Sequence, residues 1–219
     1  GENSWKQISW EQALDEIAEQ MKKLIDRYGP ETIGTTSGTG RTTDEFRWRF
    51  FNLLGSPNVV GQGNICYGEY MALMYSVYGW KLFPVVRPET ECIILWGGGG
   101  PRYWNALWRN IVKAHKEGTK LIVIDPRGID TVREADLWLQ VRPGTDCALA
   151  MGMIRHIIEE NLYDKVFVEK WCHGFDELRE RVKPFTLKKV SEITWVPEEK
   201  VRKAAEWYAT LKPAAITHG

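Results

Sequence analysis

The sequence predicts an α/β protein with a Rossmann-like, doubly wound and mostly parallel sheet that carries helices on both faces. Short apolar runs alternate with segments of helical periodicity through the middle of the chain. The runs are rich in β-forming residues and too short for helices, which is typical of parallel strands buried on both faces. A polar or glycine-containing loop follows each run at once, as expected of strand–loop–helix units.

Five segments are predicted as strands. The three central ones are the most apolar, and each ends in a loop that contains glycine or proline. The predicted strands are 32–36, 92–96, 120–124, 137–141 and 214–217.

Helical segments separate these strands. Ser9 and Gln12 form a capping-box pattern before the first helix, and Gly29-Pro30 ends it. A second helix is expected over 44–54, a third over 67–78, and a fourth between the glycine-rich loop at 97–101 and Gly118. Further helices are expected from Thr145 or Asp146 to Ile158, in short pieces after Asp164, and over 197–211.

The chain of 219 residues is longer than the ~150 residues of an average domain. We expect residues 1–61 to be part of a discontinuous α/β domain to which the chain returns at about 213–219, and residues 62–212 to be the Rossmann-like domain. The sequence starts at Gly1 rather than Met, so we expect a piece of a longer protein whose compartment cannot be read.

Composition excludes several classes of function. Lys+Arg and Asp+Glu both number 29, and a formal net charge of zero argues against a nucleic-acid-binding protein. The longest apolar stretch, 148–154, is far shorter than the ~20 residues of a membrane span, so we expect no direct membrane insertion. The four cysteines include no C-x-x-C pair, which argues against a zinc ribbon or a local iron–sulfur site.

Five polar loops are candidates for binding a ligand. Ligands of open parallel sheets bind outside the carboxyl ends of the strands, where free amides at helix starts favour phosphate. Several such loops together indicate a long ligand with more than one phosphate, although each loop by itself is also explained as an ordinary turn. The loops are 37–42, 61–64, 97–101, 125–128 and 142–146.

Cys66 is the candidate for metal chemistry because it directly precedes a predicted helix. A helix N-terminus favours the thiolate, which is both a nucleophile and a soft metal ligand. The alternative is a small buried side chain, the usual fate of a free cysteine. We expect Cys92 and Cys147 in the core and Cys172 in a structural role.

Several of these segments together resemble the molybdopterin oxidoreductases of the dimethyl sulfoxide reductase type. The resemblance covers nearly the whole chain, and its motifs are specific only in combination. It is carried by 8–14 (ISWEQAL), 52–58 (NLLGSPN), 63–66 (GNIC), 93–97 (IILWG), 121–127 (LIVIDPR), 142–146 (RPGTD), Gly174-Phe175 and Val196-Pro197.

The resemblance implies a molybdenum or tungsten centre held by two molybdopterin guanine dinucleotides. Cys66 then falls on the position of the protein ligand to the metal and is the expected catalytic residue, and 62–212 becomes the molybdopterin-binding domain. Residues at three loops fall on contacts to a guanosine and its phosphates: Trp96, Gly97, Gly98, Gly99, Asp125, Pro126, Arg127, Gly144, Thr145 and Asp146.

The resemblance also implies redox or oxygen-atom transfer on a small-molecule substrate, although related enzymes hydrate or rearrange theirs. It implies a 4Fe-4S cluster in an upstream domain and an iron–sulfur electron-transfer subunit as partner. Gly99 stands where many members carry Asn, and Tyr67 stands where formate-oxidising members carry His, which argues against formate oxidation. We expect this chain alone to be inactive.

Two other functions remain open. Large subunits of respiratory NADH dehydrogenases keep this fold without the metal and are not catalytic. A nicotinamide dinucleotide dehydrogenase would use Asp125 as a ribose acceptor, although 97–100 does not match G-x-G-x-x-G.

Overall fold

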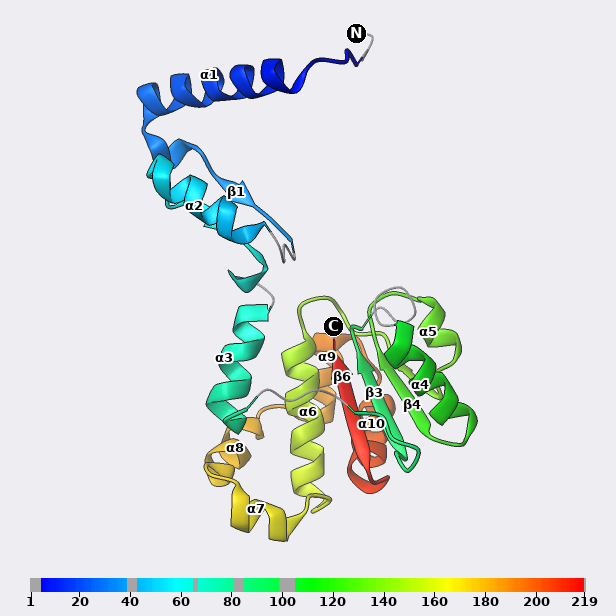
Figure 1. Cartoon of the computed structure of the whole chain (residues 1–219). Helices are drawn as coiled ribbons and strands as arrows, with labels where there is room; N and C mark the ends of the chain where they lie inside the picture. The colour runs from blue at the N-terminus through cyan, green and yellow to red at the C-terminus, as the bar shows by residue number, and fades with distance from the viewer. Residues whose placement is uncertain (1–4, 39–42, 65–66, 81–84, 99–104, 219) are drawn as a thin grey trace. The chain divides into compact units, whose positions relative to one another are not determined.

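The protein consists of two compact units, Gly1–Leu82 and Phe83–Gly219. Figure 1 draws the computed structural model, and each unit is described here by itself. The structure describes residues 5–38, 43–64, 67–80, 85–98 and 105–218.

The first unit consists mainly of helices and contains a small two-stranded parallel sheet. Strand β1 pairs with β2 in parallel, with Thr35 opposite Val59 and Thr36 opposite Val60. Its elements are α1 (Trp10–Tyr28), the 3-10 turn η1 (Pro30–Thr32), β1 (Thr35–Thr36), α2 (Asp44–Leu54), β2 (Val59–Val60), the 3-10 turn η2 (Gln62–Asn64) and α3 (Tyr67–Tyr78).

The predicted ends of α1 are confirmed. The Gln12 amide donates to Ser9 Oγ at 3.1 Å, whereas the Gln12 side chain donates to Glu16, so half of the capping box forms. Gly29 ends the helix at φ +89°, and its amide donates to the Ile25 carbonyl at 2.8 Å. A positive φ of this kind favours glycine.

The second unit contains a four-stranded parallel sheet in the order β5-β4-β3-β6. Cys92 lies opposite Lys120 on β4 and opposite Ala214 on β6, so β3 is paired on both sides. The elements are β3 (Cys92–Trp96), α4 (Asn105–Lys116), β4 (Lys120–Ile124), α5 (Asp130–Arg133), β5 (Leu137–Leu139), α6 (Asp146–Glu159), α7 (Lys165–Trp171), α8 (Phe175–Val182), α9 (Leu187–Thr194), α10 (Glu198–Thr210) and β6 (Ala214–His218).

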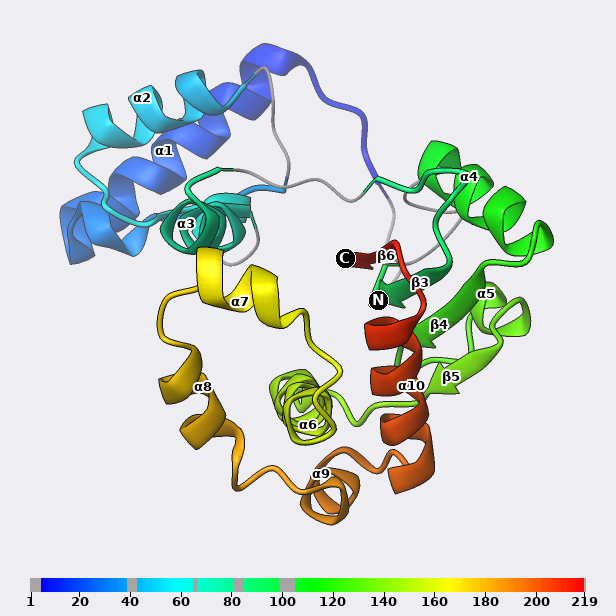
Figure 2. The same ribbon diagram turned by 90° about the horizontal axis from the view of Figure 1, so that it is seen from below.

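Helices cover both faces of this sheet, as Figure 2 shows for α10 on one side and α4 on the other. Alternate strand residues point to opposite faces. Ile94 and Ile122 pack with residues of α6, α9 and α10, whereas Ile93 and Leu121 pack with Ile111 of α4. The predicted α/β class with a doubly wound parallel sheet is confirmed.

Two expectations about domain organisation need correction. Strand β6 does not return to the first unit but pairs with β3 in the second, from Cys92 opposite Ala214 to Trp96 opposite His218. This pairing gives hydrogen-bond partners to the backbone N–H and C=O groups on the side of β3 that faces away from β4. The contacts place the boundary between Leu82 and Phe83 rather than near residue 61.

Some strands are shorter than predicted. Strand β1 loses its first residues because Pro30–Thr32 forms a 3-10 turn. Strand β5 ends at Leu139, since the Val141 amide turns back to the Leu139 carbonyl at 3.0 Å.

An ionic cluster lies at the amino ends of β4 and β5. The Asp136 carboxylate accepts hydrogen bonds from the Leu121 amide at 2.9 Å and from Lys120 Nζ at 3.1 Å. Burial by itself raises the pKa of Asp136, but these two hydrogen bonds and the charges of Lys120 and His115 hold the pKa below its usual value. The cluster therefore joins the two strands at the edge opposite to their carboxyl ends.

None of the helices in the described ranges combines the length and apolar character that a membrane crossing requires.

Candidate functional site

The carboxyl ends of the four strands of the second unit meet at one edge of the sheet. The chain runs from β3 to β4 to β5 in one direction, and β6 then lies on the other side of β3. This reversal is a topological switch point, and open α/β sheets bind ligands in the crevice outside it. The three predicted binding loops of this unit follow β3, β4 and β5 at this edge.

The loop after β3 requires glycine for its backbone. Gly97 has φ +66°, and its amide donates to the Ile124 carbonyl at 2.8 Å. Apart from its two chain neighbours, no atom of the described residues lies within 4 Å of the place where a Cβ of Gly97 would be. Gly98 is buried, and Gly99 lies outside the residues that the structure describes.

A hydrogen bond joins two of the predicted binding segments. Trp96 Nε1, at the end of β3, donates to Asp146 Oδ1, at the start of α6, over 2.7 Å. Both side chains are partly buried, and Trp96 also packs against the core of the unit. The structure thus brings together two residues that lie far apart in the sequence.

The loop before α6 leaves the start of that helix uncapped. Gly144 has φ +80°, and the Thr145 hydroxyl donates to the Arg142 carbonyl at 2.7 Å instead of accepting from a helix amide. No side chain of the described residues caps α6. Free amides at a helix start attract an anion such as phosphate.

The loop after β4 presents a buried carboxylate. Asp125 is only 3% exposed, and its Oδ1 accepts the Arg127 amide at 2.8 Å across Pro126. Arg127 Nε lies 3.7 Å from the same oxygen, and Trp138 Nε1 donates to the Asp125 carbonyl at 2.9 Å. The position after the second strand is the one where Rossmann folds use an acid to bind ribose hydroxyls.

The cysteines differ in their surroundings. The candidate metal ligand, Cys66, lies outside the described residues. Cys92 is fully buried in β3, and burial followed by the charge of Asp136 raises its pKa to about 12, so it stays a neutral thiol. Cys147 is exposed at the start of α6, so its expected burial is wrong, and Cys172 is exposed as well.

The metal part of the site is therefore not described by these residues. Among the described ranges, no group of three or more His, Cys, Asp and Glu side chains could hold a metal ion.

Sequence reasoning missed one neighbour of the α6 loop, Trp195. Arg142 lies over the ring of Trp195 at 5.0 Å, and its amide donates to the Thr194 carbonyl at 2.8 Å. Arg142 belongs to the motif 142–146, which was a signal for its position. No sequence signal marked Trp195, because its position beside this loop depends on how α9 ends against the loop.

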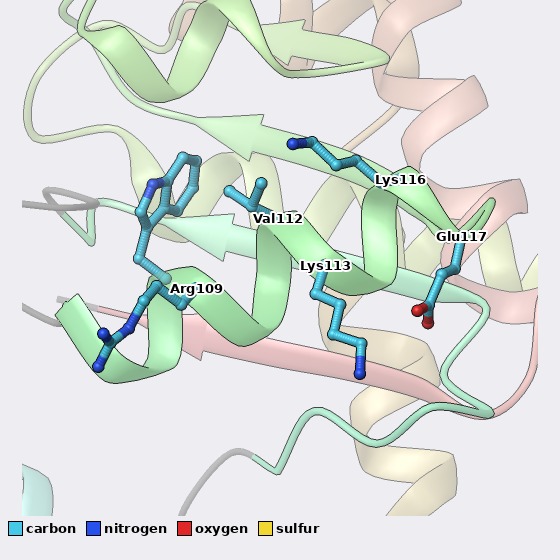
Figure 3. A pocket seen from close by; sticks show the side chains of 6 residues that line it. Arg109, Val112, Lys113, Lys116 and Glu117 are labelled. Carbon is cyan, nitrogen blue, oxygen red and sulfur yellow. The ribbon is translucent and has the colours of Figure 1, made fainter.

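A depression lies along α4. Figure 3 shows the side chains that line it, among them Arg109 and Lys113 of this helix. None of its lining residues is a predicted site residue. The lining residues are Trp108, Arg109, Val112, Lys113, Lys116 and Glu117.

The residues at the carboxyl edge fit the nucleotide end of a dinucleotide cofactor. Asp125 and Asp146 offer acceptors for ribose hydroxyls or for the N–H groups of guanine. Gly97 has no side chain, so a ligand can come close to the backbone there. The uncapped amides of α6 and the guanidinium of Arg127 are donors that suit phosphate oxygens. The donor set therefore matches a phosphorylated nucleoside.

The chain belongs to the molybdopterin oxidoreductase family, since the family model "Molybdopterin oxidoreductase" matches residues 1–219. Acetylene hydratase of Syntrophotalea acetylenica is 44% identical over 219 residues, covering 99% of this chain and 30% of that protein. Formate dehydrogenase H of Escherichia coli (strain K12) is 34% identical over 219 residues, covering 97% of this chain and 31% of that protein. The chain thus spans about a third of the length of these relatives.

A solved structure has the same fold. Acetylene hydratase from Pelobacter acetylenicus superimposes with a TM-score of 0.70 at 42% sequence identity, covering 98% of this chain and 30% of that chain. The resemblance to the dimethyl sulfoxide reductase type is confirmed: dimethyl sulfoxide reductase DmsA of Escherichia coli (strain K12) is 33% identical over 260 residues, covering 100% of this chain and 31% of that protein.

Proposed function

We propose that this chain is the cofactor-binding part of a molybdenum- or tungsten-dependent enzyme that performs redox or oxygen-atom transfer chemistry on a small molecule. The observation that carries the proposal is the family match over residues 1–219, joined to a carboxyl edge whose groups suit a nucleotide. The cofactor is a pair of molybdopterin guanine dinucleotides.

The second unit binds the guanosine and phosphates of one dinucleotide in this proposal. The carboxylate of Asp125 receives the ribose hydroxyls, because it directly follows the carboxyl end of β4, the position where Rossmann folds place an acid for ribose. The carboxylate of Asp146, held by Trp96, receives the N–H edge of guanine. The backbone and side chains that line the phosphates are those of Gly97, Gly98, Gly99, Pro126, Arg127, Gly144 and Thr145.

Cys66 is the proposed metal ligand. Its thiolate is a soft donor that suits molybdenum or tungsten, and it tunes the metal's reactivity. When bound, the metal supplies the exchange of electrons or of an oxygen atom with substrate. A 4Fe-4S cluster upstream and an iron–sulfur partner subunit would carry the electrons.

The test is a Cys66→Ser variant of the intact protein, with Cys172→Ser as the matched control because Cys172 is an exposed cysteine away from the start of α6. We expect altered metal spectra and lost activity in the first variant and wild-type behaviour in the second. Unchanged metal spectra and activity in Cys66→Ser would remove Cys66 from the metal. Elemental analysis without molybdenum or tungsten in the wild type would instead favour a non-catalytic subunit.

A second candidate function is hydration of a small unsaturated substrate. It is favoured by the 44% identity to a protein named acetylene hydratase, compared with 34% to a formate dehydrogenase. Adding water to acetylene gives an enol that rearranges to acetaldehyde, with no net electron transfer. Formation of acetaldehyde from acetylene without an added electron acceptor would support this function, and acceptor-dependent turnover of another substrate would exclude it.

A further inference from the structure

Arg142 carries a positive charge that the described residues leave unpaired. No carboxylate of the described ranges forms an ion pair with it, and no acceptor there takes its guanidinium N–H groups. Arg127, the other exposed arginine of the predicted loops, lies 3.7 Å from the Asp125 carboxylate, which offsets part of its charge. Arg142 is therefore the freer cation of the two.

The backbone of Arg142 is held in place at the carboxyl edge. Its amide donates to the Thr194 carbonyl at 2.8 Å, and its carbonyl accepts from the Thr145 amide at 3.2 Å and the Thr145 hydroxyl at 2.7 Å. These bonds fix Arg142 beside the uncapped start of α6. Its side chain therefore starts from a defined point next to the amides that suit an anion.

Trp195 restrains the side chain of Arg142. The guanidinium carbon lies 5.0 Å from the ring centre, within the range of a cation–π interaction. Trp195 holds a left-handed conformation at φ +63°, which is uncommon for a bulky residue, and the residue is 68% exposed. A cation–π contact of this kind uses a face of the guanidinium, and its N–H edge is then available to a ligand.

We infer that Arg142, positioned by Trp195, binds a phosphate of the nucleotide that lies at the carboxyl edge. The inference rests on the proposed function, because it takes the guanine dinucleotide as the ligand. A guanidinium edge offers paired N–H donors that match phosphate oxygens, and a restrained side chain loses less entropy on binding. The exposed position makes the contact sensitive to salt.

The experiment measures how long the intact, cofactor-loaded protein keeps its guanine nucleotide. The protein is incubated at about 0.05 M and about 0.5 M sodium chloride, desalted, and hydrolysed with acid, and the GMP released per polypeptide is quantified. We expect Arg142→Gln to lose nucleotide about tenfold faster than wild type at low salt, as for one hydrogen-bonded charge. Wild-type loss should accelerate with salt, and the loss from Arg142→Gln should respond less.

Further variants separate a phosphate contact from a purely structural role. Arg142→Lys keeps the charge and should restore most of the retention, whereas Trp195→Leu should lose nucleotide about threefold faster. If Arg142→Gln is purified without guanine nucleotide, Arg142→Lys must still contain it. The inference would be overturned if both variants lacked the nucleotide. So would equal retention by wild type and Arg142→Gln at both salt concentrations.

Arg179→Gln is the matched control. Arg179 also lies over an aromatic ring, 5.2 Å from the Phe175 centre, but it lines a depression with Glu159 at the far end of α6. That helix has 14 residues, which at ~1.5 Å each separates its ends by about 21 Å. Arg179→Gln should retain nucleotide as wild type does. A wild-type protein without any guanine nucleotide would instead refute the proposed function itself.

Discussion

The hydrogen bond between Trp96 and Asp146 should couple the end of β3 to the start of α6. The donor and acceptor atoms are 2.7 Å apart, and the acceptor is a carboxylate. Hydrogen bonds to charged groups stabilise proteins by about 1.5–3 kcal/mol, and water competes for these partly buried groups, so we expect a coupling of about 1–2 kcal/mol.

A double-mutant cycle isolates this coupling. Trp96→Phe removes the donor but also part of the packing against the core, so the single variant overstates the bond. The free energy of unfolding of Trp96→Phe, Asp146→Ala and the double variant is compared by hydrogen exchange of peptides from β3 and α6 in the intact protein. A coupling energy below ~0.3 kcal/mol would show that the two side chains do not stabilise each other and would refute the reasoning.

Three further predictions concern the second unit. Gly152→Ala should lower stability by about 1 kcal/mol in thermal unfolding, because its Cβ would lie 2.6 Å from Val190 Cγ2, and adding Val190→Ala should recover part of the loss. Asp136 has a lowered pKa, so it stabilises the folded state above the unfolded pKa of ~3.9 and loses that effect as pH falls through the folded pKa. The stability of Asp136→Asn should depend less on pH in this acidic range than that of wild type. An unchanged dependence of stability on pH would contradict a lowered pKa of Asp136 in the folded state. Iodoacetamide at about pH 8 should label Cys147 but not Cys92 in the folded protein, since the Cys92 pKa is about 12 and its side chain is buried; mass spectrometry of digested protein checks this.

The α/β class and most strand positions follow from local sequence. The apolar runs at 92–96 and 120–124 form β3 and β4 with the predicted bounds, because a continuous apolar segment of five residues is stable only when buried on both faces. The ends of α1 were equally readable, since Ser9 and Gly29 act through bonds to nearby residues. Local signals of this kind need no knowledge of the rest of the fold.

The partner of β6 could not be read in the same way. The segment 214–218 has the composition of a strand, but its neighbour depends on which edge of a sheet is open after α10 returns the chain. The same limit applies to the burial of Cys147, because the exposed side of α6 is set by the packing of Leu149 and Met153. These outcomes depend on long-range contacts that no local pattern encodes.

The sequence by itself determined the fold class, the loops that follow the strands, and the family to which the chain belongs. Only the tertiary structure decided that the indole of Trp96 holds Asp146, and that Trp195 lies against Arg142. Each of these pairs joins residues that are about 50 positions apart, and only the packing of the parallel sheet with its helices brings them within bonding distance.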